Sequence, residues 1–334
     1  MATTMMDIAK DLKVSVVTVS KVLRNQGRIS EATRKRVLRR AKELNYETNW
    51  VARSLVTRRT YTIGLLLPEF THPFFAEIAR AVAQTVRPHG YHVVMSCFDE
   101  DPELESSEAG SLLARQVDGF IIASSQPPRC LEMFKRIQER NVPYVLIDRP
   151  IAGLQACFVG VDNRTIGRLA TEHLIARGCR RIGHLRGPDI GIAAERLQGY
   201  RRALAKRGLP EHSRYIVAGG HTDDTGYEGM RQLLRASPIP DGVFCYNDPV
   251  AIGAMKAILE AGLKLPHDIS LVGAGNVHYS DVLAVPLTTI DQGTCRMGVH
   301  AAELLIERIS SKRSLRPRRI LIQPKLVERE STRR

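Results

Sequence analysis

The sequence predicts an α/β protein: a small all-helical N-terminal head, then a long core of doubly wound parallel sheets arranged in two lobes. From Tyr61 onward, short apolar segments alternate with amphipathic helical patterns. That alternation is typical of parallel sheets joined by right-handed crossovers. It runs through two successive series, which indicates two similar lobes. Before Tyr61 the apolar residues recur only at helical spacing.

The core expectation depends on two series of elements. Strands are expected at 62–67, 91–96, 119–123 and 144–148, and then near 158–161, 181–185, 215–218, 242–245 and 270–273. Helices are expected at 74–88, 104–115 and 130–140, and then near 163–177, 194–207, 224–235 and 249–261. Short buried strands of this kind bind ligands at their carboxyl ends.

Composition excludes several classes of protein. With 334 residues and 43% hydrophobic content, the chain suits two or three folded domains and not wholesale disorder. No apolar run approaches the ~18 residues that span a bilayer, and no signal core is present, so we expect no membrane partner and a cytoplasmic location. The six cysteines form no C-x-x-C pair and are interpreted as small apolar residues, not as disulfides or zinc ligands.

Positive charge is concentrated at the N-terminus. Residues 1–60 contain 14 Lys or Arg against five acids, and so account for +9 of the chain's net charge of +14. A small domain with this much positive charge is expected to bind the phosphate backbone of a nucleic acid. A merely soluble basic surface is the second interpretation.

Two short helices separated by a tight turn are predicted within residues 7–23. Ile8, Ala9 and Leu12 recur at helical spacing, and the hydroxyl of Ser15 can cap the second helix. The second helix has an inner apolar face and an outer face that is small, hydroxylated and basic. Val19, Val22 and Leu23 form the inner face, and Val16, Val17, Ser20 and Lys21 form the outer face. This is the plan of a helix-turn-helix DNA reader; two helices of any small helical domain are the alternative.

Each residue type on the outer face predicts a different contact. The methyl groups of Val16 and Val17 can meet thymine methyls, and Lys21 is the candidate for a guanine contact. Ser15 and Thr18, at the start of the helix, are expected to hold phosphate. A third helix at 31–44, capped by Ser30, adds basic side chains that partly face the backbone: Arg34, Lys35, Arg36, Arg39 and Arg40.

Motifs for catalysis are absent from the sequence. We find no phosphate loop, no nucleotide-binding G-x-G-x-x-G after a strand, no nucleophile elbow and no metal-ligand spacing. We therefore expect no catalytic residues, no cofactor and no metal. A binding protein without DNA activity would fit residues 61–334, but such proteins are normally exported. The attached basic helix-turn-helix unit favours a transcription regulator.

Nearly the whole chain resembles the LacI/GalR family of bacterial transcription regulators. In the head, the similarity lies in Asp7-Ile8-Ala9, Val14-Ser15, Thr18 to Leu23, Thr33 to Val37, Leu44-Asn45-Tyr46, Asn49 and Val51 to Leu55. In the core, it includes His72 to Phe75, Asp118-Gly119, Asp148-Arg149, Val161-Asp162-Asn163, Arg196, Asn247-Asp248 and Pro286 to Ile290. The core of this family is shared with periplasmic sugar-binding proteins.

The resemblance implies a division of the chain. Residues 1–48 would be the helix-turn-helix domain and residues 49–60 the hinge helix and linker. Residues 61–334 would be a periplasmic-binding-protein-like core for effector binding and dimerisation. Its N-lobe would comprise 61–161 and 292–323, and its C-lobe 162–291 and 324–334, with the chain crossing between lobes near 161, 291 and 323.

The resemblance also implies how the hinge contacts DNA. Asn49, Ala52 and Leu55 would lie in the minor groove, with Leu55 pushed between base pairs to kink the duplex. Packing of Leu55 against the first domain is the alternative. Three departures from the family pattern occur in this region, one of which is Glu47-Thr48 in place of the usual residue and proline before the hinge. Lys13 occupies a turn position where Gly is common, at a cost of ~1–2 kcal/mol if φ is positive there. Arg24 replaces the usual Asn and would add a phosphate contact.

By resemblance the effector lies between the lobes. Phe74 would stack on it, and its polar contacts would be Arg149, Asp162, Arg196, His221 and Asn247. Each has a plainer interpretation: Phe74 as core, Asp162 as the cap of the helix at 163, Arg196 as the partner of a surface acid such as Glu195. Gly275 stands where the family often has a sugar-gripping Asp. We therefore hypothesise an effector other than a simple neutral hexose, with anionic character matched to Arg149 and Arg196.

The function implied is that of a cytoplasmic, nucleoid-associated regulator, most often a repressor. A homodimer would bind a pseudo-palindromic operator, each head reading one half-site. A small carbohydrate-related effector would shift the lobes and change whether the hinges order on DNA, a coupling typically worth ~1–3 kcal/mol. The tail after Arg329 has no leucine heptads, so we expect dimers and not tetramers. The sequence leaves open the effector, the operator, and induction versus corepression.

Overall fold

The computed structural model describes residues 3–23, 27–46, 54, 59–311 and 315–333. The chain divides into two compact units, residues 1–60 and 61–334. Each unit has its own hydrophobic core.

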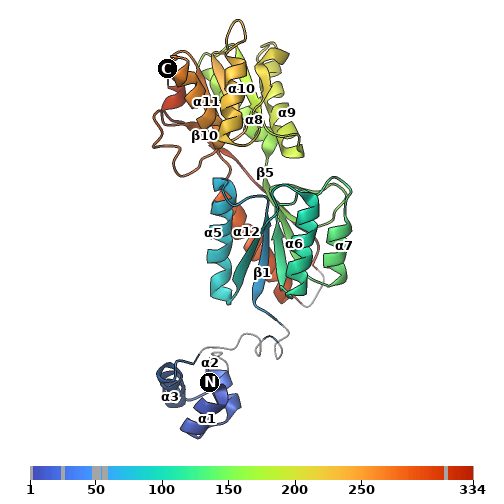
Figure 1. The fold of residues 1–334 in the computed structure, drawn as a ribbon, viewed down its shortest axis with the longest axis vertical. Helices are drawn as coiled ribbons and strands as arrows, with labels where there is room; N and C mark the ends of the chain where they lie inside the picture. The colour runs from blue at the N-terminus through green and yellow to red at the C-terminus, as the bar shows by residue number, and fades with distance from the viewer. Residues whose placement is uncertain (1–2, 24–26, 47–53, 55–58, 312–314, 334) are drawn as a thin grey trace. The chain divides into compact units, whose positions relative to one another are not determined.

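The described residues of the N-terminal unit form three helices: α1 (Met5–Leu12), α2 (Val16–Leu23) and α3 (Glu31–Glu43) (Figure 1). Thr4 and Asp7 form a reciprocal capping box at the start of α1, and the Ser15 hydroxyl accepts the Thr18 N–H at 3.0 Å. Ile8 and Val19 are fully buried. The periodic apolar positions of the sequence therefore form the core of this unit, as predicted.

Lys13 ends α1 in the left-handed conformation, with φ 51° and ψ 46°. Its N–H is bonded to the carbonyls of Ala9 and Lys10, which satisfies part of the helix end. The turn thus has the positive φ that glycine adopts more readily. The chain accepts the ~1–2 kcal/mol strain of a non-glycine residue here.

The described residues of the second unit form two six-stranded sheets. The first has the order β11-β5-β4-β3-β1-β2, and all its strands are parallel. Its strands are β1 (Thr62–Leu67), β2 (His92–Cys97), β3 (Gly119–Ile122), β4 (Tyr144–Ile147), β5 (Cys157–Val161) and β11 (Arg319–Ile322). Helices α5 (Pro73–Val86) and α12 (Thr294–Ser310) cover one face, and α6 (Pro102–Ala114) and α7 (Glu132–Glu139) cover the other (Figure 1).

The second sheet has the order β12-β10-β9-β8-β6-β7, with β12 antiparallel to β10. Its strands are β6 (Ile182–Arg186), β7 (Ile216–Ala218), β8 (Gly242–Cys245), β9 (Ser270–Gly275), β10 (Thr288–Asp291) and β12 (Lys325–Val327). Helices α8 (Asn163–Ala176) and α9 (Gly191–Lys206) pack on one face, and α10 (Asp223–Leu233) and α11 (Asp248–Glu260) on the other. The described part of the chain also contains three short 3₁₀ turns: Arg87–His89, Ser213–Tyr215 and Glu330–Thr332.

Three segments of the chain pass from one sheet to the other. They follow β5, follow β10, and join β11 to β12. Both sheets direct the carboxyl ends of their parallel strands toward these crossings, so the loops after the strands meet in one place. None of the helices within the described residues is long and apolar enough to cross a membrane.

Candidate functional site

The outer face of α2 is exposed and partly apolar. Val16 is 40% and Val17 61% exposed, Lys21 is exposed and Ser20 is half-buried. Large apolar side chains left in water on a polar unit indicate a contact surface. Of the other residues predicted to meet DNA, Ser15 and Thr18 bond to each other through their hydroxyls at 2.8 Å. Four lie outside the described residues: Arg24, Asn49, Ala52 and Leu55.

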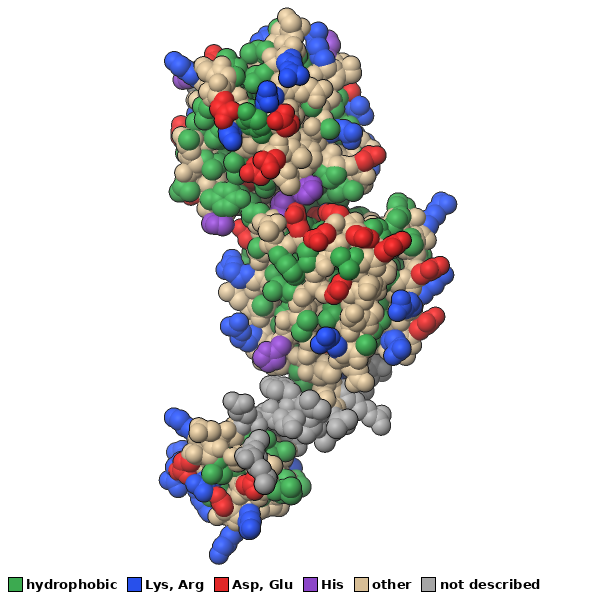
Figure 2. All heavy atoms as spheres, in the orientation of Figure 1, with side chains coloured by type: hydrophobic (Ala, Val, Ile, Leu, Met, Phe, Trp, Pro, Cys, Tyr) green, Lys and Arg blue, Asp and Glu red, His purple; other side chains and the backbone are tan. Residues whose placement is uncertain are grey.

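The basic residues of α3 divide into two groups. Arg36 donates to the Leu12 carbonyl at 3.2 Å, and Arg40 binds the Asp11 carboxylate at 2.5 Å, so these two arginines hold α3 against α1. The sequence prediction treated them only as basic surface, because it could not show that α1 supplies acceptors. Figure 2 shows Lys and Arg side chains spread over the visible face of this unit.

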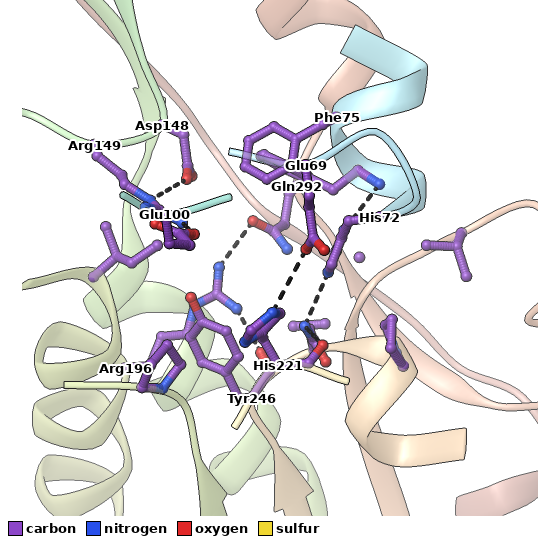
Figure 3. A pocket seen from close by; sticks show the side chains of 18 residues that line it. Glu69, His72, Phe75, Glu100, Asp148, Arg149, Arg196, His221, Tyr246 and Gln292 are labelled. Carbon is purple, nitrogen blue, oxygen red and sulfur yellow. Dashed lines mark hydrogen bonds and ion pairs between the residues drawn. The ribbon is translucent and has the colours of Figure 1, made fainter. Parts of the chain in front are cut away.

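A cavity of about 50 Å³ lies between the two sheets, at the carboxyl ends of their strands (Figure 3). Its walls come from the loops after β1, β2 and β4 of the first sheet and after β6, β7, β8, β9 and β10 of the second. Five of the six residues predicted to contact an effector line it: Phe74, Arg149, Arg196, His221 and Asn247. The topology therefore collects residues from position 74 to position 247 in one place.

Asp162 is the sixth predicted residue and is not part of this lining. Its carboxylate caps α8, accepting the Thr165 N–H at 3.1 Å and the Thr165 hydroxyl at 2.8 Å. Asp162 thus acts as the cap of the helix that begins at Asn163, and both of its oxygens are engaged there.

Arg196 is buried and holds four segments together. Its guanidinium donates to the Asn163 amide oxygen at 2.9 Å, to the Tyr246 carbonyl and to the Gln292 amide oxygen at 3.0 Å, and it stacks on the Tyr246 ring at 4.6 Å. Helices α8 and α9 approach so closely that a Cβ at Gly167 would lie 2.0 Å from the Arg196 carbonyl oxygen. The surface pairing with Glu195 that the sequence allowed is therefore absent, since Glu195 faces Arg164 at 3.9 Å.

Arg149 is neutralised within the cavity wall. Its two terminal nitrogens bind the two Glu100 oxygens, and its Nε lies 3.6 Å from the Asp148 carboxylate. Burial opposes the charge of Arg149, but the hydrogen bond to Glu100 and the charge of Asp148 raise its pKa. Burial also raises the pKa of Asp148, against the pull of Arg149. Asp148 has a φ of 62°, a backbone conformation that residues other than glycine rarely adopt.

The charge of the cavity does not support the anionic effector that the sequence suggested. Among the described residues its lining carries three carboxylates, Glu69, Glu100 and Asp148, against the guanidiniums of Arg149 and Arg196. Both guanidiniums already have protein partners. An added anion would meet net negative charge and no uncommitted guanidinium, so we withdraw that hypothesis.

The carboxylate of Asp248 occupies the space beside Gly275. Asp248 is fully buried and accepts bonds from the Val277 N–H, the Ser280 hydroxyl and the Thr289 hydroxyl. A Cβ at Gly275 would lie 3.3 Å from the Asp248 carboxylate, tighter than an ordinary contact. Because its oxygens are satisfied internally, Asp248 does not substitute for a ligand-gripping carboxylate.

Two pairs of polar side chains face each other across the cavity, one from each lobe. His72 Nε2 lies 3.0 Å from Asn247 Nδ2, and His221 Nε2 lies 3.7 Å from a Glu69 oxygen (Figure 3). Burial, together with the nearby charges of His221, Arg196 and Arg149, lowers the pKa of His72 to about 4. His72 is therefore neutral at pH 7. No group of three or more potential metal ligands occurs among the described side chains.

The lowered pKa of His72 predicts that the folded protein loses stability in acid. As pH falls, the unfolded chain protonates His72 near the ordinary value of 6.5, whereas the folded chain resists until about 4. The free energy of unfolding should therefore fall between those values, by about 3 kcal/mol from His72. In urea titrations at pH 7 and pH 4.5, His72→Ser should lose less stability than the wild type. Equal losses would contradict the assignment; His184, whose burial lowers its pKa to about 4 as well, remains in both proteins.

Comparisons with known proteins agree with this geometry. Residues 4–49 match the family model for bacterial regulatory proteins of the lacI family, and residues 171–332 match a periplasmic binding protein-like domain. The ribose operon repressor of Halalkalibacterium halodurans is 38% identical over 99% of this chain and 97% of its own. The chain belongs to the LacI family. It is a DNA-binding transcription regulator and not an enzyme.

Two solved structures of LacI-family regulators resemble the chain. The lac repressor dimer bound to operator and the anti-inducer ONPF is 28% identical, with a TM-score of 0.86 and 99% of each chain covered. A LacI family regulator from Enterococcus faecium with bound ribose is 26% identical, with a TM-score of 0.74, covering 81% of this chain and 98% of that one. A transcription regulator acts in the bacterial cytoplasm, where the chromosome lies.

Several residues of the LacI-family cleft were missed from the sequence. Glu69, His72, Glu100, Asp148, Tyr246 and Gln292 all line the cavity. Each lies within three residues of the end of a strand or caps a helix, and polar residues at such positions also serve as ordinary caps. Glu69, Glu100 and Asp148 are acidic residues at or shortly after the ends of predicted strands, and that position is the sequence signal that marks them.

Proposed function

We propose that the chain is a repressor that binds a pseudo-palindromic operator as a homodimer and is controlled by a neutral carbohydrate held between its lobes. The observation that carries this proposal is the cavity at the carboxyl ends of two parallel sheets, in a chain whose N-terminal unit is a helix-turn-helix. We assign residues 1–48 to DNA reading, 49–60 to the hinge and 61–334 to effector binding and dimerisation. When bound to its operator, the protein would lie in the nucleoid.

The DNA contacts are proposed from the outer face of α2. Val16, Val17, Ser20 and Lys21 would face base edges, and Ser15, Thr18 and Arg24 would hold phosphate. The hinge residues Asn49, Ala52 and Leu55 would enter the minor groove. The exposure of Val16 and Val17 supports this assignment, since methyl groups on this face suit thymine.

For the effector we propose a neutral, hydroxyl-rich molecule of pentose size. Phe74, with Phe75 edge-on at 5.2 Å, supplies an apolar wall, and Asn247, His221 and His72 supply polar groups. Carboxylates such as Asp148 accept from sugar hydroxyls. A cavity of 50 Å³ is well below the ~300 Å³ of ordinary ligand pockets, but a neighbouring cavity of about 780 Å³ shares Glu100, Arg149 and His221 with it and supplies the remaining space.

Calorimetry with D-ribose and D-ribose 5-phosphate tests this proposal. D-Ribose should bind at least about tenfold more tightly, because the phosphate would be placed among Glu69, Glu100 and Asp148. Tighter binding of the phosphate ester would restore the anionic hypothesis. Binding of neither compound would exclude pentoses.

Leu55→Ala should reduce operator bending, because a smaller side chain cannot separate the base pairs at the kink. The bend angle can be measured by circular-permutation gel shifts on the selected operator. Ser54→Ala is the matched control next to it and should bend DNA like the wild type. An unchanged bend with Leu55→Ala would remove the wedge role from this residue.

A further inference from the structure

His72 and Asn247 face each other from opposite lobes of the closed cleft. His72 is the N-cap of α5 and Asn247 is the N-cap of α11, and His72 Nε2 lies 3.0 Å from Asn247 Nδ2 (Figure 3). Which of these two nitrogens donates depends on the other hydrogen bonds of each side chain. Those bonds determine the orientation of the Asn247 amide and the tautomer of the His72 ring.

The Asn247 amide has one orientation. Its Oδ1 accepts the Val250 N–H at 2.9 Å, and its Nδ2 donates to the His221 carbonyl at 2.9 Å. Turning the amide over would place N–H against N–H at Val250 and oxygen against oxygen at His221. The group that Asn247 presents to His72 is therefore the second hydrogen of its Nδ2.

The His72 ring also has one tautomer. Its Nδ1 accepts the Phe74 N–H at 3.2 Å and so carries no hydrogen. A neutral imidazole carries a single N–H, which must then be on Nε2. Neutrality at pH 7 agrees with the pKa of about 4 that burial gives this residue. Two N–H donors thus point at each other across the cleft.

We propose that the Nε2–H of His72 and the Nδ2–H of Asn247 form a donor pair that shares one acceptor oxygen of the effector, and that their mutual repulsion opposes tight closure of the empty cleft. This inference rests on the proposed function, because it concerns the same cavity. It names the group that the ligand must bring to this point: an oxygen with two available lone pairs, such as a hydroxyl, ring or carbonyl oxygen.

The two helices behind these residues favour the same group. Helices α5 and α11 both begin at the pair, so the positive ends of two helix dipoles converge on the space between Nε2 and Nδ2. Partial negative charge on a ligand oxygen is stabilised there. With the oxygen in place, one repulsive contact becomes two hydrogen bonds that join the lobes, so closure follows binding.

The tautomer of His72 can be measured without a ligand. In the full-length chain labelled with ¹⁵N-histidine, long-range proton–nitrogen spectra distinguish a protonated Nε2 from a protonated Nδ1, and His72→Ser identifies the signal. We expect the Nε2–H form. The Nδ1–H form would overturn the proposal, because Nε2 would then accept directly from Asn247 as an ordinary latch.

The donor role is tested by calorimetry with D-ribose. His72→Ser keeps an oxygen that can cap α5 but removes the Nε2–H, and the shorter serine hydroxyl does not extend to the position of Nε2, so D-ribose should bind about tenfold more weakly. His89→Ser, at an exposed histidine of the same lobe, should bind like the wild type. Equal affinity in both variants would overturn the shared-oxygen role. Failure of the wild type to bind D-ribose would count against the proposed effector, while the tautomer would still decide the donor pair.

Discussion

Arg196→Met is expected to lower the free energy of unfolding by about 3–5 kcal/mol, because the guanidinium satisfies three buried acceptors at once. Without it, the Asn163 oxygen, the Tyr246 carbonyl and the Gln292 oxygen lose their donors. Methionine replaces much of the volume, so the loss reports hydrogen bonding more than packing. Chemical denaturation of the full-length chain, monitored by circular dichroism, measures it.

Arg201→Met is the matched control on the same helix. The Arg201 side chain is 49% exposed and pairs with Glu211 at 2.9 Å, an arrangement typically worth less than about 1 kcal/mol. The two variants remove the same charge from α9 and differ in burial. If both shifted the midpoint equally, the buried network around Arg196 would not stabilise the core as described.

Lys21→Ala is expected to weaken binding to the preferred operator by about 1–3 kcal/mol and to relax base preference at one position of each half-site. Lys21 is exposed on the same face of α2 as Val17, so its ammonium group can reach a guanine edge. Fluorescence anisotropy with the preferred operator and with single-base variants measures both effects.

Lys10→Ala controls for loss of charge alone. Lys10 is exposed on α1, outside the predicted reading helix. Its removal should weaken all sequences slightly and equally, as a general phosphate attraction would. If Lys21→Ala behaved in the same way, Lys21 would be a phosphate contact, and base choice would rest on the valine methyls and on DNA deformability.

Much of the fold was predictable because its core strands are short, apolar and regularly spaced. The strands at 62–67 and 242–245 have the bounds that their apolar runs predict. The alternation did not reveal β10, β11, β12 or α12. Strand β10 contains two threonines and an aspartate, β12 has only three residues, and the apolar positions of α12 follow no recognisable strand. These elements gain their stability from packing against distant segments.

The candidate site was predictable only where one residue carries the signal. Asn247 follows a clear strand and opens a clear helix, so its position at the cleft could be expected. The role of Arg196 depends on Asn163 and Gln292, which are 33 and 96 residues away, and no local pattern indicates their meeting. The tautomer of His72 likewise depends on a backbone N–H and on an amide from the other lobe.

The most direct test measures whether effector binding changes operator affinity. An operator is selected from a random DNA pool with the full-length protein, and its affinity is measured alone and with each of a panel of neutral sugars that includes D-ribose. We expect one sugar to change operator affinity by at least fivefold, and His72→Ser to need more of that sugar for the same change. An operator bound equally with every sugar and with cell metabolites would contradict effector control of this regulator.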